Sequence, residues 1–312
     1  MILVTGATGF VGRRIVARLT AAGHAVRCLV RPAYKERQLP PGVSVHVVAG
    51  DLADVAALRV ALQDADTVIH LAGIWAQRGA RTFEAVNYQG TLNLLEAALE
   101  VGASRIIFSS YPTADRNSAF AFLRSKGLAE EAIKSCGLSF TILRPSLVYG
   151  AEDYLTTNIA TALKSVPFVF PVVGDGQTRF QPLWVEDLAA CIERCLSNPK
   201  TIGHTLALGG PAYLTINDML DIIARTLRVH RRKVFVRVPL ARAAAEWMER
   251  VMPRPLLTTT TVDLLGVDTT TELGAVSRHF GFDPARFADA VDYLCDQPWR
   301  RIFLSRFVGG QR

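Results

Sequence analysis

The chain has 312 residues, half of them apolar, and its 35 lysines and arginines against 28 aspartates and glutamates give a net charge of +7. This length can bury a sizeable core and predicts two domains, or one large domain with a satellite. The basic balance suits either an anionic partner or a basic surface that only keeps the protein soluble. The basic clusters at 228–237 and 300–307 lack the aromatic interleaving of RNA-binding segments, so we expect no nucleic-acid binding.

The cysteines and histidines favour neither a secreted protein nor a metal site. The five cysteines are scattered and form no Cys-x-x-Cys pair, which favours a reducing compartment. No histidine stands at metal-ligand spacing from another histidine or a cysteine, so we expect no metal. A strand that starts at residue 1 argues against a signal peptide, and no apolar run reaches the roughly 18–20 residues that cross a bilayer. We therefore expect a cytoplasmic protein, either free or peripheral at the inner face of the membrane.

The first half of the chain alternates strands with helices. Apolar, β-prone runs predict strands at 1–5, 25–30, 43–50, 66–73, 104–110 and 139–145. Helical periodicity predicts helices from about residue 10 to Gly23, and at 54–62, 81–100 and 118–135. Such alternation indicates an α/β protein with a doubly wound parallel sheet of the Rossmann type, whose ligands bind at the carboxyl ends of the strands.

Gly6, Gly9 and Gly12 stand between the first strand and the first helix. In this context Gly6 permits a tight turn, Gly9 lets the backbone approach a pyrophosphate, and Gly12 lets the helix pack on the strand. The free N–H groups at the start of the helix then meet the phosphates. The sequence therefore predicts a dinucleotide site at this turn.

These segments together resemble the extended short-chain dehydrogenase/reductase superfamily. The resemblance rests on the glycine spacing and on "GDL" at 50–52, "LAG" at 71–73, "VNYQGT" at 86–91, "RPSLVYG" at 144–150 and "GDGQTRFQPLWVEDLA" at 174–189. It implies a Rossmann domain of residues 1–150 and 182–209, and a smaller, mostly helical, substrate-side domain of residues 151–181 and 210–312. The cofactor-binding residues that it implies are Gly6, Thr8, Gly9, Phe10, Val11, Gly12, Arg31, Asp51, Leu52, Leu71, Ala72, Gly73, Ser109, Lys126 and Pro145.

The end of the second strand favours NADP(H) over NAD(H). Members that bind NAD carry an acidic residue there, which holds the ribose 2′-hydroxyl, whereas this chain has Arg31. A guanidinium can meet a 2′-phosphate with two charge-assisted hydrogen bonds. The resemblance also implies that Asp51 and Leu52 lie against the adenine ring.

The helix at 118–135 departs from the pattern of catalytic members. Those members carry Tyr-x-x-x-Lys, in which tyrosine is the acid or base and lysine binds the nicotinamide ribose. Here Lys126 has the lysine position but Phe122 has the tyrosine position, and phenylalanine has no proton to exchange. In the run "SSY", Tyr111 stands where a Ser or Thr hydroxyl is expected. Tyr111 is therefore a candidate replacement acid, or an aromatic shield for the nicotinamide.

The second half resembles, more narrowly, the nucleotide-binding accessory subunit of respiratory complex I and its bacterial relatives. The resemblance rests on residues 122–155, 203–220 and 238–268, and implies an NADP(H) that stabilises structure without turnover. We expect a non-catalytic or weakly catalytic NADP(H)-binding protein with a structural or sensing role, within a respiratory assembly or outside one. The alternative is a reductase, epimerase or dehydratase acting on a nucleotide sugar or a lipid-like quinone. Tyr111 or the acids of "AEDY" at 151–154 would then carry the proton, with Tyr149 a weaker candidate.

The C-terminal segment "QPWRRIFLSRFVGGQR" mixes aromatic and basic residues. It suits either a peripheral contact with an anionic membrane or membrane-bound complex, or a last helix packed on the small domain. In the membrane contact, the apolar residues that enter the headgroup layer are Trp299, Ile302, Phe303, Leu304 and Phe307. The arginines that stay near the phosphates are Arg300, Arg301, Arg306 and Arg312.

Overall fold

The computed structural model describes residues 1–32, 39–304 and 306. Contacts group the chain into two compact units. Unit 1 comprises Met1–Pro145, Val185–Leu208 and Arg278–Gly281, and unit 2 comprises Ser146–Trp184, Gly209–Ser277 and Phe282–Arg312. The division into two domains stays a prediction about independent folding units.

Unit 1 is built on a seven-stranded sheet with the order β11-β6-β5-β4-β1-β2-β3, in which every neighbouring pair is parallel. Its strands are β1 (Ile2–Thr5), β2 (Val26–Val30), β3 (His46–Ala49), β4 (Thr67–His70), β5 (Arg105–Ser109), β6 (Ser139–Pro145) and β11 (His204–Leu208). The chain leaves β1 in one direction through β2 and β3 and returns to its other side through β4. This reversal is the topological switch point at which Rossmann-type sheets bind ligands. The predicted fold class is confirmed.

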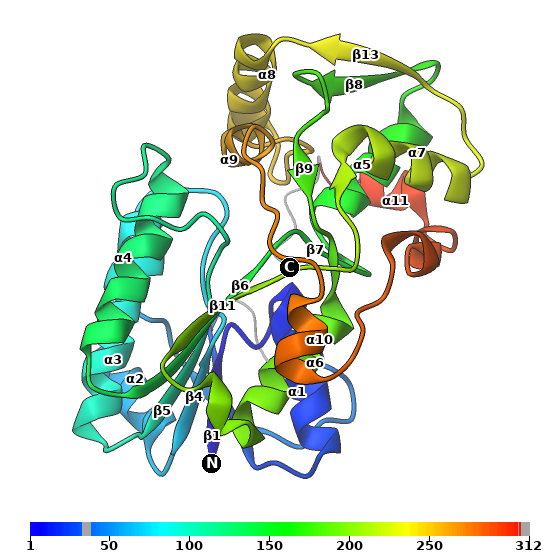
Figure 1. Ribbon diagram of the computed structural model, residues 1–312. Coiled ribbons are helices and arrows are strands. Elements are labelled where there is room, and N and C mark those ends of the chain that lie inside the picture. Colours follow the sequence, from blue (N-terminus) through cyan, green and yellow to red (C-terminus); the bar gives the residue numbers. More distant parts are fainter. Residues whose placement is uncertain (33–38, 305, 307–312) are drawn as a thin grey trace. The chain divides into compact units, whose positions relative to one another are not determined.

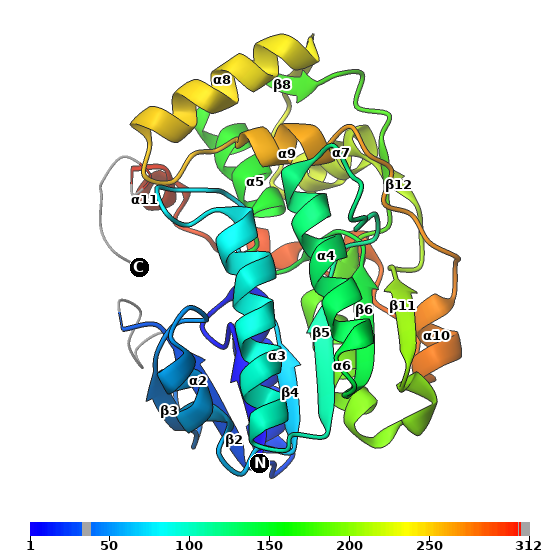
Figure 2. The same cartoon turned by 90° about the vertical axis from the view of Figure 1, so that its left-hand side faces the viewer.

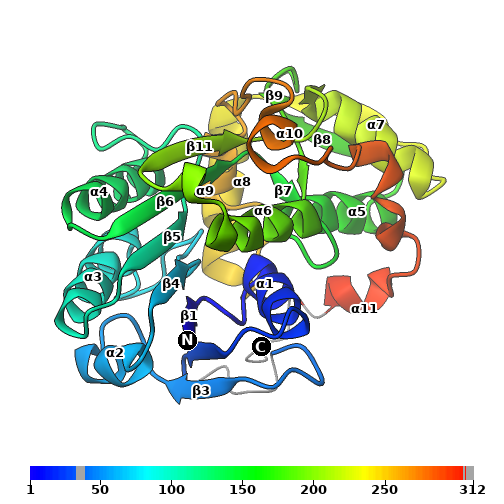
Figure 3. The ribbon, with the colours of Figure 1, turned by 60° about the horizontal axis from the view of Figure 1, so that its bottom comes forward.

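Helices cover both faces of this sheet. The helices α2 (Val55–Leu62), α3 (Gly90–Glu100) and α4 (Ala121–Ser135) lie on one face, and α1 (Phe10–Ala21) and α6 (Val185–Ser197) lie on the other (Figures 2 and 3). Each buries an apolar stripe because apolar residues recur at helical spacing, as with Ile15, Val16 and Leu19 of α1. Arg18 of α1 pairs with Glu193 of α6.

The predicted helix at 81–100 begins differently in the structure. A π-helical turn, η2 (Glu84–Gln89), precedes α3. Within this widened turn the side chain of Asn87 bonds both backbone groups of Ile74, accepting from its N–H at 2.9 Å. Single π-turns inside helices are frequent at functional sites, and this one lies beside the loop that follows β4.

Unit 2 combines three two-stranded sheets with short helices (Figure 1). The pairs are β7 (Val148–Tyr149) with β10 (Leu183–Trp184), β9 (Arg179–Phe180) with β12 (Leu214–Thr215), and β8 (Val169–Val173) with β13 (Arg232–Val236). The helices are α5 (Leu155–Ser165), α7 (Ile216–Thr226), α8 (Val238–Val251), α9 (Thr259–Leu264) and α11 (Trp299–Leu304). The short helix α10 (Ala275–Phe280) and the 3-10 turns η3 (Pro199–Thr201), η4 (Phe287–Asp289) and η5 (Asp292–Leu294) complete the described elements.

Local sequence signals account for several element boundaries. Thr215 and Asp218 form a capping box at the start of α7, as their spacing predicts. Gly23 follows α1 with φ of +79°, a conformation that ends a helix at little cost for glycine. Cys191 and Cys195 are buried on the inner side of α6, where their role is packing.

Candidate functional site

The glycine turn between β1 and α1 is shaped by close backbone approach. Gly6 has φ of +75°, and a Cβ there would lie 2.7 Å from the backbone nitrogen of Ala72. A Cβ at Gly12 would lie 2.0 Å from the carbonyl oxygen of Gly6. Both positions therefore exclude any side chain, so that the turn, the first turn of α1 and the end of β4 meet closely.

The first turn of α1 offers unpaired backbone donors. Gly9 is its N-cap, no side chain caps it, and the first turn contains no acidic residue. The N–H groups of Phe10, Val11 and Gly12 have no intrahelical partner, and the helix dipole adds positive potential there. Together with Thr8 in the preceding turn, this arrangement fits a pyrophosphate group.

Arg31, Asp51 and Leu52 lie beyond the carboxyl ends of the adjacent strands β2 and β3. Arg31 directly follows β2 and is partly exposed. The carboxylate of Asp51 accepts from the N–H of Ala53 at 3.3 Å. Leu52 is buried, and its carbonyl accepts from the side chain of Asn93 at 2.9 Å. The ligand roles of these residues stay predictions.

A buried polar relay supports the loop after β4. The N–H of Ala72 donates to Thr5 Oγ1 at 3.4 Å, and Thr5 Oγ1 lies 2.7 Å from His70 Nδ1. His70 Nε2 lies 3.0 Å from Thr91 Oγ1, which donates to the carbonyl of Asn87 at 2.7 Å. These donors run in one direction if His70 carries its proton on Nε2.

His70 is therefore held neutral at the centre of the relay. Burial first, and the charge of Lys126 second, lower the pKa of His70 to about 3. This residue is not among the candidates that the sequence suggests, because a histidine at the end of a buried strand resembles a core residue. Its neighbours along the relay come from three other elements.

Lys126 lies buried at the centre of the predicted site. Its Nζ donates to the carbonyl of Ser109 at 3.1 Å and lies 4.8 Å from the ring centroid of Phe108. A Cβ placed on Gly73 would lie 3.5 Å from the same nitrogen. Burial lowers the pKa of Lys126 to about 8, against the opposing effect of Glu130. The lysine thus bridges the ends of β4 and β5.

The position expected for a catalytic tyrosine is filled by an aromatic cluster, formed by Trp75, Phe83, Tyr111 and Phe122. Phe122 is buried, with ring centroids 4.6 Å from Trp75 and 5.6 Å from both Phe83 and Tyr111. Trp75 stacks on it and is 58% exposed, so that it forms the outer wall. The surroundings of Phe122 are therefore apolar, apart from the hydroxyl of Tyr111.

Tyr111 is buried in this cluster and poorly suited to ionise. Burial raises the pKa of its hydroxyl, and within the described residues that hydroxyl has no hydrogen-bond partner. The hydroxyl of the preceding residue, Ser110, is buried and also lacks a partner among the described residues, as does that of Thr113. Ser110 was missed from the sequence, since the third position of "SSY" drew attention to Tyr111.

Asp153, one of the acidic residues after β7, accepts hydrogen bonds that stabilise the fold of unit 2. Asp153 is buried in unit 2, and its carboxylate accepts from the N–H groups of Gly150 at 2.9 Å and Thr156 at 2.7 Å. It also accepts from the hydroxyls of Thr156 and Tyr293. Asp153 therefore ties the start of α5 to the C-terminal region.

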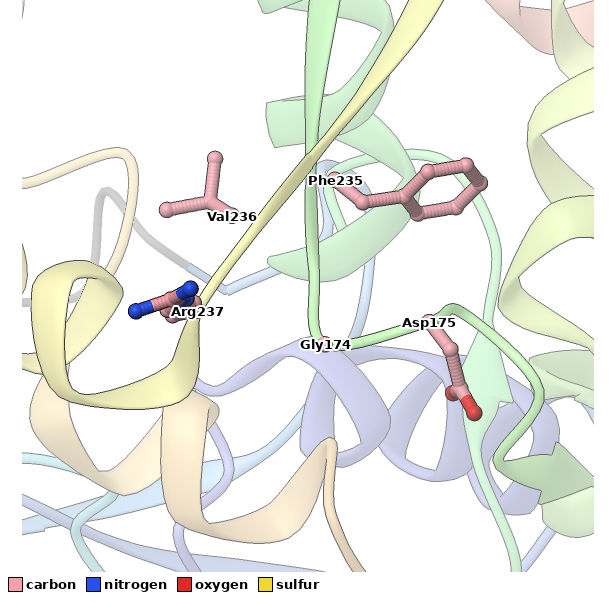
Figure 4. A pocket seen from close by; sticks show the side chains of 5 residues that line it. All are labelled: Gly174, Asp175, Phe235, Val236 and Arg237. Carbon is pink, nitrogen blue, oxygen red and sulfur yellow. The ribbon is translucent and has the colours of Figure 1, made fainter.

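Unit 2 has a surface hollow of about 270 Å³ (Figure 4). Its lining consists of Gly174, Asp175, Phe235, Val236 and Arg237. None of them is among the predicted site residues. Along the described chain, no group of three histidine, cysteine or acidic residues could hold a metal ion, and no helix is long and apolar enough to cross a membrane.

The structure gathers most of the predicted site residues at one edge of the sheet in unit 1. The turn at 6–12, the loop at 71–73, and Ser109 with Lys126 lie at the carboxyl ends of β1, β4 and β5. Pro145 is the last residue of β6. The described residues thus form a site suited to a dinucleotide and poor in proton donors.

Comparisons with known proteins agree with this geometry. The model of the "NAD dependent epimerase/dehydratase family" matches residues 2–209. A mitochondrial complex I protein of Arabidopsis thaliana, "NADH dehydrogenase [ubiquinone] 1 alpha subcomplex subunit 9", is 32% identical over 263 residues. That match covers 81% of this chain and 65% of the relative, so this chain spans about two thirds of the relative's length.

Two further similarities come from enzymes. The chloroplastic divinyl chlorophyllide a 8-vinyl-reductase of Oryza sativa subsp. indica is 30% identical over 299 residues, covering 89% of this chain and 69% of the relative. The solved UDP-glucose 4-epimerase of Thermus thermophilus in complex with NAD shares the fold, with a TM-score of 0.70 and 22% identity over 96% of this chain and 98% of that one. On the evidence of its matched residues and its fold, the chain belongs to the NAD dependent epimerase/dehydratase family of the extended short-chain dehydrogenase/reductase superfamily.

Proposed function

We propose that this protein binds NADP(H) and uses it as a structural or sensing group, with little or no hydride turnover. The observation that carries the proposal is the aromatic cluster around Phe122. It occupies the place of the family's proton donor with a ring that cannot exchange a proton. Membership of the family supports binding of a nicotinamide dinucleotide.

The residues present fit such a cofactor at three points. The uncapped first turn of α1 suits the pyrophosphate, since it offers backbone donors and no acidic side chain. Arg31 at the end of β2 suits a 2′-phosphate better than a 2′-hydroxyl. The buried Lys126, held by the carbonyl of Ser109, suits the hydroxyls of the nicotinamide ribose.

The chain's own residues then decide what happens at the nicotinamide. When bound, the cofactor supplies hydride-transfer chemistry. Lys126 positions the ribose, and Trp75, Tyr111 and Phe122 exclude water from the volume beside it. No side chain at position 122 can protonate an oxygen there, so the expected outcome is retention of the reduced cofactor.

Calorimetric titration of cofactor-free protein tests the binding half of the proposal. We expect NADPH to bind more tightly than NADH, and Arg31→Asp to abolish or reverse this preference. Arg27→Asp is a matched control on the same strand, since its guanidinium bonds carbonyls of the α2 end instead. Equal affinities for the two cofactors in the wild type would contradict the role of Arg31.

The turnover half is tested with bound NADPH and a panel of sugars, aldehydes, ketones and quinones. We expect no member to oxidise the cofactor at a typical enzymic rate of roughly 1–1,000 per second. Phe122→Tyr restores the missing hydroxyl one turn before Lys126 and is expected to raise any residual rate. A wild-type rate within that range would overturn the non-catalytic role.

A reductase is the second candidate, favoured by Tyr111, whose ring packs against Phe122, and by the buried hydroxyl of the preceding Ser110, which has no hydrogen-bond partner among the described residues. The similarity to a plant reductase supports this class. In that case the wild type turns over without a tyrosine at position 122, and Ser110→Ala and Tyr111→Phe are each expected to reduce its turnover rate. The same substrate panel separates the two candidates.

The similarity to a complex I subunit supports a place for the protein beside a membrane-bound respiratory assembly. We propose a cytoplasmic location with peripheral attachment at the inner face of the membrane. Copurification of tagged protein with complex I subunits tests assembly membership, and its absence from that fraction leaves the cofactor role intact.

A further inference from the structure

Helix α8 of unit 2 has two apolar faces. Its inner face carries Ala241 and Ala245, which are buried against Val262 of α9 and neighbouring residues. Another side, roughly a third of a turn around the helix, carries larger side chains. Leu240, Trp247 and Val251 are 64%, 61% and 58% exposed. Spacings of seven and four residues place these three on one side of the helix. We call them, with the exposed Ala244 between them, the outer stripe.

The chain's positive charge is concentrated around this helix. Residues 228–254 contain eight arginines and lysines and two glutamates, a balance of 8 − 2 = +6 against +7 for the whole chain. Arg232, Arg237 and Arg250 are exposed, and within the described structure their side chains have no hydrogen bond or ion pair. By contrast, Arg242 pairs with Asp263 and Glu246.

The strand that leads into α8 continues the exposed apolar surface. On β13, Val234 is 43% exposed and Phe235 is 58% exposed. Figure 4 shows Phe235 and Val236 pointing to opposite sides of this strand, with Arg237 where the chain turns into α8. Exposed apolar side chains and arginines are therefore interspersed along β13 and at the start of α8.

The geometry is that of an interfacial helix and not of a spanning one. At about 1.5 Å per residue, a helix of 14 residues is about 21 Å long, which is shorter than the ~30 Å hydrocarbon core of a bilayer. A helix with an apolar side and flanking arginines lies in the plane of the membrane, where apolar groups enter the headgroup layer and cations meet phosphates.

Pairing with a second copy is disfavoured by the same charges. A two-fold interface places the same patch of each copy against itself. The outer stripe of one copy would then bring its uncompensated arginines close to those of the other, and like charges in contact are destabilising. An anionic surface has the opposite charge and needs no shape complementarity.

We propose that the outer stripe, with Arg232, Arg237 and Arg250, docks this protein on an anionic membrane surface. The docking does not depend on the bound cofactor. The C-terminal segment 299–312 is a weaker candidate for such a contact, because Trp299 and Arg306 are buried. Phe307 and Arg312, which the sequence suggested for it, lie outside the described residues.

Cosedimentation with vesicles tests the proposal on the full chain. The wild-type protein is expected to sediment with phosphatidylglycerol vesicles and to stay in the supernatant with phosphatidylcholine vesicles. Added salt is expected to release the bound protein. A stripe variant, Leu240→Ser with Trp247→Ser and Val251→Ser, and a charge variant, Arg232→Gln with Arg237→Gln and Arg250→Gln, are each expected to bind at least about tenfold more weakly. Val60→Ser with Leu99→Ser is the matched control, because it removes exposed apolar side chains from unit 1.

Each other outcome overturns the proposal. Absence of wild-type binding to anionic vesicles does so directly, as does binding that the charge variant retains in full. Sedimentation velocity adds a second readout, in which a dimer that the stripe variant dissociates identifies the stripe as a contact between copies. The charge variant changes only exposed side chains, so it remains informative if the stripe variant fails to fold.

Discussion

Substitution of the buried Lys126 by methionine tests two effects of this lysine: the cost of burying its charge in the folded protein and its proposed contact with the cofactor ribose. Burial holds the pKa of this lysine at about 8, compared with its ordinary value of 10.5. The folded chain thus releases the proton more readily than the unfolded chain, which means that burying the charged form costs free energy. Methionine has a similar length and no charge, so it removes that cost and with it the proposed ribose contact.

The magnitude follows from the two pKa values. A lowering of this size corresponds to roughly 3 kcal/mol, at 1.36 kcal/mol per pKa unit. Because the unfolded state binds more protons between the two values, wild-type stability rises with pH in this window. Relative to Lys126→Met, the free energy of unfolding of the wild type is expected to rise by roughly 2–3 kcal/mol between pH 7 and pH 10. The difference is nearly constant only about one pH unit or more below the folded-state pKa.

Urea denaturation of both proteins at pH 7, 8, 9 and 10, without cofactor, measures this difference. The comparison cancels the titrating groups that Lys126 does not affect, and also the constant loss of the bond to Ser109. His70, whose pKa Lys126 does lower, titrates far below this pH range. Lys200→Met, at an exposed position, is the control and is expected to give no such slope. A difference between wild type and Lys126→Met that stays flat to pH 10 would refute the buried, charge-destabilised lysine. NADPH affinity is expected to fall in Lys126→Met in the same preparations.

Three further outcomes are expected from the structure. Phe122→Ala removes a buried ring with three aromatic neighbours and should lower the free energy of unfolding in urea by about 3–5 kcal/mol, whereas Phe122→Leu should cost clearly less. Gly12→Ala places a Cβ 2.0 Å from the carbonyl oxygen of Gly6, so we expect a loss of about 3 kcal/mol or failure to fold, seen by circular dichroism. Glu130→Ala leaves the guanidinium of Arg144 without its buried partner and should cost about 3–5 kcal/mol, and a cost near zero would contradict the pairing.

Much of unit 1 could be predicted because its signals are local. The strand at 139–145 is observed with the predicted bounds, since its β-prone residues lie between the turn at Gly137 and Pro145. The substitution at position 122 was also visible, because a one-turn spacing from Lys126 defines the place of the absent tyrosine. Patterns read within one element identify which residues share a face.

Contacts between distant elements could not be predicted in the same way. Trp75 and Phe83, which surround Phe122, come from the segment between β4 and η2, and precede it by 122 − 75 = 47 and 122 − 83 = 39 residues. The relay through His70 depends on hydroxyls from β1 and α3, each of which resembles an ordinary buried threonine when read alone. The π-helical turn at Asn87 likewise depends on a bond to Ile74, and no local pattern distinguishes it from an α-helix.

Helix α8 shows how a sequence pattern can indicate the wrong face. Hydrophobicity alone directs Leu240, Trp247 and Val251 inward, because they are its large apolar residues at helical spacing. In the structure small residues, Ala241 and Ala245, take the inner face, where α9 lies alongside (Figure 2). A chain that left such residues in water would lose the free energy of burying them, about 1.5–3 kcal/mol for each of the aliphatic ones. The outward orientation is therefore costly for an isolated protein and becomes favourable when a membrane surface covers this face.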